Sequence, residues 1–381
     1  MIIAKFFSEI NLKVAGALGF DYYFISMKIA LFGCGKIGTA IATLLKSLKI
    51  ETFLFDKNIE QAKYLGELLG FRYEKLDLDK FSQTPPKILR QVDCLICALP
   101  FSVTFRCAEL AADLGLNYAD LTEDIETSEK IRKLPVKKNF FLTQCGLAPG
   151  LISVFAKRIY SQFEKLEEVK LRVGALPLYP SNALKYNITW STEGLINEYL
   201  QDCVVIKDGK IKTVPALEDL ETIIIDGATY EAFNTSGGLG TLHKTLEGKV
   251  ENLNYKTIRH LNHCHYIKFL LNDLKLRQKP DLLVDILESA LPTTPQDKCI
   301  VYVEVKGVKD RKYQQLTFSR TVYHRTVAKK DFSAIQLCTA AGVIAPVLIA
   351  LKQNLRGSLR VEDLNQEEVL NTKVVKQIFN A

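Results

Sequence analysis

The sequence feature that most constrains the fold is a glycine pattern, G-x-G-x-x-G, at residues 33–38. It comes directly after the apolar run Lys28–Phe32, and an amphipathic helical pattern follows it as far as Leu48. A second apolar run, residues 52–55, then ends in Asp56, 18 residues after the third glycine. A strand, a glycine turn, a helix, a strand and a terminal acid in this order are typical of a Rossmann-type unit that binds a dinucleotide.

Each position of the pattern has a physical role in such a unit. Gly33 permits the tight turn out of the first strand, Gly35 lets the backbone approach the pyrophosphate, and Gly38 allows the helix to pack closely on the strand. Lys36 and Ile37 begin the helix, where free N–H groups and the positive end of the helix dipole favour a phosphate. These five residues are therefore predicted to bind the cofactor.

The acid at the end of the second strand bears on which dinucleotide is bound. Asp56 is expected to accept hydrogen bonds from the ribose hydroxyls of the adenosine. Its charge would repel the 2′-phosphate of NADP, so the sequence favours NAD. The neighbouring Lys57 would partly offset that repulsion, and NADP is therefore not excluded.

The alternation of strands and helices continues along the chain. Helical patterns cover residues 61–69 and 101–114, and apolar strand-like runs cover 92–99, 118–121 and 140–143. This alternation predicts an α/β fold with a doubly wound parallel sheet, in which ligands bind beyond the carboxyl ends of the strands. Four residues at those ends join the predicted cofactor-binding set: Leu99, Pro100, Asp120 and Gly146.

The sequence changes in character after Gly150. Alternating apolar and polar residues there predict a second, α+β domain of mainly antiparallel sheet. Near the end of the chain, a long apolar stretch with small residues is expected to form a buried helix that returns to the first domain. The expected organisation is an N-terminal extension (1–26), a dinucleotide-binding domain (27–149, with 332–355 packing on it), a substrate-binding domain (150–331) and a C-terminal tail (356–381).

Composition excludes several classes of protein. Of 381 residues, 48% are hydrophobic and 24% are charged, which is ordinary for a folded protein of two domains. The nine cysteines are scattered, and Cys94 and Cys97 lie inside one strand-like run, so a reducing, cytoplasmic environment is predicted instead of a disulfide framework. The apolar stretch at residues 14–20 is too short to span a bilayer, so no membrane partner is expected.

The charge of the chain does not indicate a nucleic-acid partner. The formal net charge is +7, and its dense basic stretch, Lys306–Lys312, surrounds a predicted hairpin turn. A charged run at a turn is typical of a solvated surface. Two-fold homo-oligomers are the commonest kind, so a homodimer is the expected assembly.

Several separated segments show a common resemblance: YADLTED (118–124), QCGLAPG (144–150), VGALP (173–177), LKYNITWS (184–191), EGLINEY (193–199), EAFNTSGGLGT (231–241) and KTIR (256–259). With them the chain resembles the saccharopine dehydrogenase family, from Met27 to about residue 355. The resemblance implies hydride transfer between a nicotinamide cofactor and a carbon that bears nitrogen. One departure is His260-Leu261-Asn262, where the family commonly has Tyr-Pro-Gly, so the backbone after Arg259 must turn differently.

A site for this reaction needs a carboxylate clamp for the substrate. Arg259 is the predicted clamp, because a guanidinium binds a carboxylate through two parallel hydrogen bonds. Lys185 lies in an aromatic stretch with Tyr186 and Trp190 and is expected to bind a second carboxylate or to act as a base. Both residues could instead have a purely structural role. Arg259 would then form an ion pair at the surface, and Lys185 would pack its aliphatic chain on apolar residues with its ammonium group in water. The expected substrate-binding set also includes two residues from another of the matching segments: Asn234 and Thr235.

The site also needs groups that exchange protons. His263 is the favoured acid–base residue because imidazole titrates near neutrality. Asp120, at the end of a strand near the expected nicotinamide, and Lys185 are the other catalytic candidates, and a turn or N-cap role is the alternative for Asp120. Glu123 and Asp124 are weaker candidates of the same kind. Possible metal ligands cluster at His260, His263, Cys264 and His265. Their spacing is too tight for all four to converge on one ion, so no metal is predicted.

The resulting hypothesis is an NAD(P)-dependent dehydrogenase that acts on a CH–NH or CH–NH2 group in lysine metabolism, with saccharopine as the substrate. Lysine 6-dehydrogenase and carboxynorspermidine dehydrogenase activities are alternatives, and a non-catalytic NAD(P)-binding sensor is the alternative from another class. Saccharopine carries three carboxylates and requires two convergent cations, Arg259 and Lys185. A polyamine-related substrate requires acids in the pocket instead, such as Asp120, Glu123 and Glu193.

Overall fold

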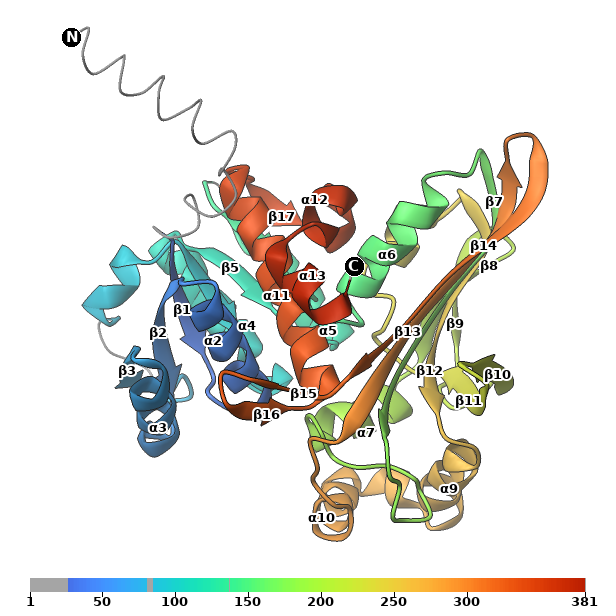
Figure 1. The fold of residues 1–381 in the computed structure, drawn as a ribbon, viewed down its shortest axis with the longest axis horizontal. Coiled ribbons are helices and arrows are strands. Elements are labelled where there is room, and N and C mark those ends of the chain that lie inside the picture. The colour runs from blue at the N-terminus through green and yellow to red at the C-terminus, as the bar shows by residue number, and fades with distance from the viewer. Residues whose placement is uncertain (1–26, 81–84, 137, 381) are drawn as a thin grey trace, which may run out of the picture.

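The structure is a computed structural model that describes residues 27–80, 85–136 and 138–380. The proposed N-terminal extension, residues 1–26, lies outside the described residues. Two sheets, each with its own helices, lie on either side of the long helix α11 (Figure 1). The first sheet is built by the N-terminal part of the chain, and the second by the part that follows Gly150.

The first sheet has seven strands, and all of them are parallel. Their order, β17-β6-β5-β4-β1-β2-β3, places the first strand of the chain in the middle and confirms the predicted doubly wound sheet. The strands are β1 (Lys28–Phe32), β2 (Glu51–Asp56), β3 (Arg72–Lys75), β4 (Cys94–Cys97), β5 (Asn117–Asp120), β6 (Phe140–Leu142) and β17 (Gly357–Leu359).

Helices cover this sheet, and apolar residues dominate the strands at its centre. In β1 and β4 nearly every residue is buried, as expected for parallel strands with helices on both faces. The sequence did not predict β3, an edge strand whose four residues are all exposed and therefore carry no apolar pattern. The helices are α2 (Lys36–Ser47), α3 (Ile59–Leu69), α4 (Phe101–Leu114), α5 (Ile125–Arg132) and the 3-10 turn η2 (Lys87–Gln91).

The second sheet is mainly antiparallel, as predicted. Its main path is β10-β11-β12-β7-β13-β14, with β8 attached to β12 and β9 to β8, and the described pair β12–β7 is parallel. A two-residue turn at Asp310 and Arg311, both with positive φ, joins β13 and β14 into a long hairpin. The strands are β7 (Lys165–Pro177), β8 (Cys203–Lys207), β9 (Lys210–Val214), β10 (Glu221–Ile225), β11 (Ala228–Asn234), β12 (Val250–Arg259), β13 (Asp297–Lys309) and β14 (Lys312–Tyr323).

Helices and short elements complete the second half of the chain. The small hairpin of β15 (Arg325–Val327) and β16 (Lys330–Phe332) leads into α11 (Ala334–Lys352). The other elements are α6 (Leu151–Tyr160), α7 (Thr192–Leu200), α8 (Leu242–Leu246), α9 (His263–Lys268), the π-helical turn η3 (Phe269–Asp273), the 3-10 turns η4 (Leu276–Gln278) and η5 (Val361–Asp363), α10 (Pro280–Ala290), α12 (Gln366–Leu370) and α13 (Lys373–Phe379).

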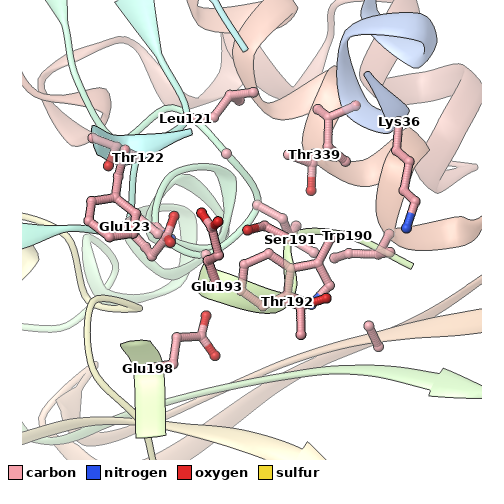
Figure 2. A pocket seen from close by; sticks show the side chains of 18 of the residues that line it. Lys36, Leu121, Thr122, Glu123, Trp190, Ser191, Thr192, Glu193, Glu198 and Thr339 are labelled. Atoms are coloured by element: carbon pink, nitrogen blue, oxygen red, sulfur yellow. The ribbon is translucent and has the colours of Figure 1, made fainter. Parts of the chain in front are cut away.

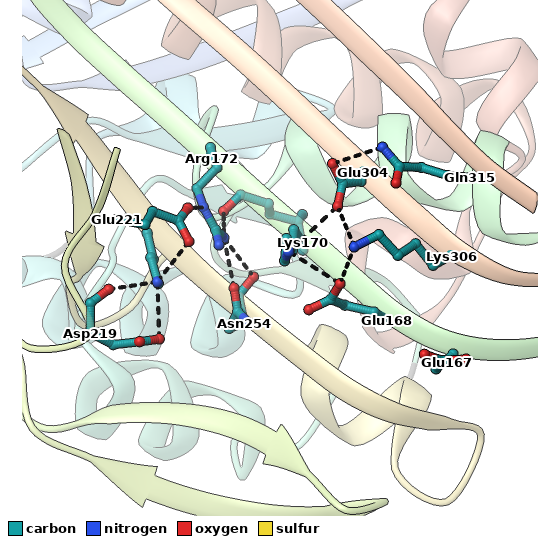
Figure 3. Close-up of polar contacts among 12 residues, drawn as sticks. Glu167, Glu168, Lys170, Arg172, Asp219, Glu221, Asn254, Glu304, Lys306 and Gln315 are labelled. Atoms are coloured by element: carbon teal, nitrogen blue, oxygen red, sulfur yellow. Dashed lines mark hydrogen bonds and ion pairs between the residues drawn. The ribbon is translucent and has the colours of Figure 1, made fainter. Parts of the chain in front are cut away.

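The two faces of the second sheet differ sharply in polarity. Valine and leucine side chains on one face join the large apolar core. On the other face Lys170 and Lys306 each contact both Glu168 and Glu304, at 2.9–3.5 Å (Figure 3). In the same network the buried Arg172 contacts Glu221, which also binds Lys256. Charged residues at alternate positions of these strands therefore pair with one another.

Helix α11 is the element that joins the two domains. A capping box between Ser333 and Gln336 begins it, and 14 of its 19 residues are buried. It packs against α2 in the first domain and β13 in the second. This helix is also long and apolar enough to cross a membrane, but 78% of its apolar window is buried inside the protein. Its hydrophobicity is therefore that of a core helix.

Residues 356–380 of the expected C-terminal tail contain regular elements that pack on the rest of the chain. Strand β17 extends the first sheet by pairing with β6, and α13 packs against α11. Val375 and Ile378 are fully buried. The segment was missed because its elements are only three to seven residues long, too short to show a clear periodicity.

This packing predicts that α13 contributes to the stability of the whole protein. Replacing Ile378 with Ala removes buried methyl groups and should lower the free energy of unfolding by about 2–5 kcal/mol. Lys376→Ala, at an exposed position of the same helix, should change it by less than about 0.5 kcal/mol. Urea denaturation of the two variants measures both values, and equal, small effects would show that the segment is peripheral.

Candidate active site

A cavity of about 450 Å³ lies between the two domains. Strand ends of the first sheet form one wall, and β7, β12 and α7 of the second domain form the other. Figure 2 shows side chains from both domains directed into this space. Its lining includes the glycine loop (Gly35–Ile37), the segments 98–101, 121–123, 146–149 and 190–193, and single residues of the second domain and α11: Val173, Ala175, Glu198, Tyr255, Thr257, Arg259, Glu288, Ile335 and Thr339.

The glycine loop fits the pyrophosphate of a dinucleotide. Gly33 has a φ of +96°, and a Cβ there would lie 2.5 Å from the carbonyl oxygen of Ala98. A Cβ on Gly38 would lie 1.9 Å from the Gly33 carbonyl oxygen. A Cβ on Gly35, which lines the cavity, would meet no atom within 4 Å. The first and third glycines therefore serve packing, while the second leaves open the space that a phosphate needs beside the start of α2.

Asp56 fastens this loop to the sheet. One carboxylate oxygen accepts a hydrogen bond from the backbone N–H of Cys34 at 2.7 Å, and the other accepts one from Asn58 at 2.8 Å. The residue is 9% exposed and is not part of the cavity lining. A carboxylate has about four acceptor sites, so these two bonds leave capacity for ribose hydroxyls.

The strand ends form the platform on which the other end of the cofactor would lie. Leu99, Pro100 and Gly146 line the cavity, as the sequence predicted for a switch-point site. Asp120 lies behind this wall and is 1% exposed. One of its oxygens accepts hydrogen bonds from the N–H groups of Thr122 and Gln144, and burial raises its pKa to about 6. Asp120 therefore holds two of the lining loops together.

Arg259 projects from β12 into the cavity wall and is 4% exposed. Its Nε donates to the hydroxyl of Tyr199 at 3.2 Å, and its Nη1 donates to the carbonyl of Ile258 at 3.0 Å. The guanidinium also lies 5.1 Å from the centre of the Tyr186 ring. These contacts leave Nη2 for a ligand and orient it. The neighbouring Lys256, on the opposite face of the strand, belongs to the charge network instead.

His263 lies behind Arg259 and is not part of the cavity lining. Its Nδ1 lies 2.8 Å from the carbonyl oxygen of Leu184, and its Nε2 lies 3.0 Å from the Tyr199 hydroxyl. Because a carbonyl only accepts, Nδ1 carries the proton and Nε2 accepts from Tyr199. Burial, reinforced by Arg259, lowers the pKa of His263 to about 3. The neutral imidazole thus completes a hydrogen-bond chain that orients Arg259.

Of the other predicted substrate-binding residues, some line the cavity and some lie outside it. Trp190 lines the cavity, and its indole N–H donates to the hydroxyl of the buried Tyr186 at 3.0 Å. Lys185 lies outside the lining, with Nζ 3.5 Å from the carbonyl oxygen of Leu261. Two more residues are buried away from the cavity, at and beyond the end of β11: Asn234 and Thr235.

Glutamates are the most abundant charged residues of the cavity lining. Glu123 comes from the loop after β5, Glu193 and Glu198 from α7, and Glu288 from α10. Burial raises the pKa of Glu198 to about 8 and that of Glu123 to about 7. The nearby Arg259 partly offsets this effect on Glu198, and a hydrogen bond to its own backbone partly offsets it on Glu123. A titratable group in a cavity with a pKa near neutrality is suited to proton transfer.

Glu198 had not been singled out from the sequence. It stands between Ile196 and Tyr199, and such apolar neighbours mark this part of α7 as a core face. A charged residue within a buried helical face is the signal that could have identified it, because unpaired buried charges are rare outside functional sites.

Two protein-family models match this chain. The model of the saccharopine dehydrogenase NADP binding domain matches residues 29–142, and that of the saccharopine dehydrogenase C-terminal domain matches residues 146–379. The chain belongs to the saccharopine dehydrogenase family. Its first domain therefore binds a nicotinamide dinucleotide, and the glycine loop provides the fitting site.

One solved structure shares the fold of this chain. Saccharopine dehydrogenase (L-Glu forming) from Saccharomyces cerevisiae has a TM-score of 0.76, with 16% identity over 93% of this chain and 98% of that one. A probable dehydrogenase from Thermotoga maritima has a TM-score of 0.44 and 12% identity, over 90% of this chain and 94% of that one.

A curated relative matches only a short region. Glutamyl-tRNA reductase from Saccharolobus islandicus is 38% identical over 58 residues. The match spans 15% of this chain and 14% of that enzyme's length.

The open space at Gly35 leads to a prediction for cofactor binding. Gly35→Ala should fold with normal stability, because its φ is −68° and its Cβ meets no atom. The added methyl group would occupy the space of the pyrophosphate, so we expect affinity for the reduced cofactor to fall at least ~10-fold in a fluorescence titration. Gly115→Ala, at a φ of +65° far from the loop, should show the reverse: lower stability and unchanged cofactor affinity. Unchanged binding by Gly35→Ala would contradict this placement of the cofactor.

The raised pKa of Glu198 leads to a prediction for stability. The folded-state pKa of about 8 lies above the ordinary value of 4.5, so the folded protein holds this proton more tightly than the unfolded chain. The corresponding stability is complete below the ordinary value and is lost as the pH rises through about 8. Thermal unfolding without ligand should therefore show a melting temperature that falls between about pH 4.5 and pH 8, and falls less in Glu198→Gln. Parallel curves for the two proteins would refute the assignment.

Proposed function

We propose that this chain is an NAD(P)-dependent dehydrogenase that acts at a carbon bearing nitrogen in an amino-acid substrate of lysine-type metabolism. The observation that carries the proposal is the position of Arg259. A buried guanidinium with a free Nη2 lies in the wall of a cavity whose other wall is the cofactor platform. A substrate carboxylate bound there would orient the rest of the molecule towards Leu99, Pro100 and Gly146.

The bound nicotinamide supplies the acceptor for the hydride. The protein must fix the substrate carbon beside the platform and take up the proton that the reacting nitrogen loses. Glu123 is placed for the second task, because it directly follows Leu121 and Thr122 of the platform and has a pKa near 7. Trp190 and Leu147, also in the lining, limit the access of water to the reacting carbon.

The cofactor preference follows from Asp56. Its carboxylate has no cationic partner within the described ranges, and a 2′-phosphate beside it would meet an unneutralised negative charge. We therefore propose that NAD is preferred to NADP.

The proposed function predicts unequal roles for the two cations first identified in the sequence. Arg259→Lys loses the two-point contact with a carboxylate, so kcat/KM should fall about 100-fold, mainly through KM. Lys185→Met should change kcat/KM by less than about 3-fold, because Lys185 lies outside the cavity lining. The kcat/KM values of both variants are measured from the absorbance of the reduced nicotinamide. Saccharopine, lysine and carboxynorspermidine are each tested, and the substrate that is turned over is used. Equal losses in the two variants would refute the assigned clamp, and cofactor binding without turnover of any of the three would favour the non-catalytic sensor.

A further inference from the structure

Glu123 lies in a space that two glycines of the second domain leave free. It belongs to the loop after β5, and its carboxylate accepts a hydrogen bond from its own backbone N–H. A Cβ on Gly194, in the first turn of α7, would lie 2.7 Å from the Oε1 of Glu123. A Cβ on Gly237, in the loop after β11, would lie 2.7 Å from the Glu123 carbonyl oxygen. Side chain and backbone of Glu123 are therefore both packed against the second domain (Figure 2).

The loop after β11 and helix α7 form one wall of the second domain. The backbone N–H of Ser236 in the loop donates to the carbonyl oxygen of Glu198 in α7 at 3.0 Å. The N–H of Gly194 donates at 3.0 Å to the hydroxyl of Ser191, which caps the helix. Because these bonds fix the two segments, Glu123 fits against a single surface.

The backbone does not require a glycine at residue 194. Gly194 lies inside a helix without a positive φ, where alanine is the better helix former. Gly237, by contrast, has a φ of +85°. What Gly194 provides is space, since its Cβ would also lie 2.7 Å from Cζ3 of Trp190. The indole N–H of Trp190 is bound to the Tyr186 hydroxyl, so the carboxylate of Glu123 is the group that a methyl group would displace.

The position of this carboxylate also determines its proton affinity. Burial is the largest cause of the rise in the pKa of Glu123 to about 7. A carboxylate displaced from the wall would gain water, so its pKa would fall towards the ordinary value of 4.5. Residues 235–241 contain no ionisable side chain. The charged groups around Glu123 are Asp120 and Asp124 of its own domain and Glu193 and Glu198 of α7.

We propose that Gly194 is a positioning residue: its missing side chain lets the proton-accepting carboxylate of Glu123 dock against α7, so that the second domain completes the base of the first. This inference rests on the proposed function, because it takes Glu123 as the acceptor of the proton that the reacting nitrogen loses. A base must lie within hydrogen-bond reach of that proton, and a misplacement of about 1 Å costs about 100-fold in rate. Gly194 itself is not part of the cavity lining, so its effect passes through Glu123.

The test replaces Gly194 with alanine in the full chain and measures turnover of the C–N substrate. We expect kcat to fall by ~10- to 100-fold, and KM for the amino acid to change by less than about 3-fold, since Arg259 is untouched. Asn197→Ala, on the same helix and outside the cavity lining, is the matched control and should change both constants by less than about 2-fold. Thermal unfolding verifies that each variant is folded. Trp190→Phe, which shortens the ring that faces Gly194, provides the background if Gly194→Ala alone unfolds.

A double-mutant cycle shows whether the added methyl group acts through Glu123. In Glu123→Gln, which lacks the base, Gly194→Ala should lower kcat by less than about 3-fold. In Glu123→Asp, whose shorter side chain leaves room for the methyl group, Gly194→Ala should also cost less than it does alone. An equal loss in all three backgrounds, or an unchanged kcat in Gly194→Ala, overturns the positioning role.

A direct titration separates this inference from the proposed function. The carboxyl carbon of Glu123 is followed by NMR in protein made with isotope-labelled glutamate, and Glu123→Gln identifies its signal. The midpoint should lie near pH 7 and should fall in Gly194→Ala but not in Asn197→Ala. A lower midpoint without turnover of any C–N substrate supports the positioning and overturns the function. Normal turnover with an unmoved midpoint and kcat in Gly194→Ala supports the function and overturns the positioning.

Discussion

A close backbone contact between the cofactor platform and helix α11 determines the shape of the whole site. Gly342 on α11 approaches Gly146 so closely that a Cβ at residue 342 would lie 2.1 Å from the Gly146 carbonyl oxygen. Gly146 lines the cavity, and so do Ile335 and Thr339 at the start of the same helix. The cofactor platform is therefore set against a core helix that also packs on β13. Because cores of this density deform little, the distance from the platform to β12 is held by packing.

The alternation of side chains along β12 separates two kinds of charge within the second domain. Tyr255, Thr257 and Arg259 face the cavity, while Lys256 faces the paired charges of the opposite surface. The lysines of that surface are paired with carboxylates of the protein itself. Among the described residues Arg259 instead contacts a hydroxyl, a carbonyl and an aromatic ring, and the nearby Glu198 attracts it without forming an ion pair. The position of Arg259 on the inward face of the strand is what makes it available to an anionic group.

Much of the fold, but less of the site, could be predicted from the sequence. Apolar runs and the glycine pattern indicate the strands and helices of the first domain, since burial on both faces leaves a strong local signal. The exposed strand β3 and the short elements after residue 356 leave none. Of the residues predicted for the site, Arg259, Leu99, Pro100 and Gly146 line the cavity, whereas Asp120 lies behind its wall. The position of His263 could not be predicted, because its partners Tyr199 and Leu184 are 64 and 79 residues away.

The glutamates of the cavity illustrate why a binding site can reduce the stability of the protein that carries it. Burial of Glu198 beside Glu123 disfavours the ionised forms and raises both pKa values towards neutrality. In the protonated form each side chain gains one O–H donor, and in the ionised form it only accepts. The cost of burying these acids and their readiness to exchange protons near neutral pH therefore have a common physical origin.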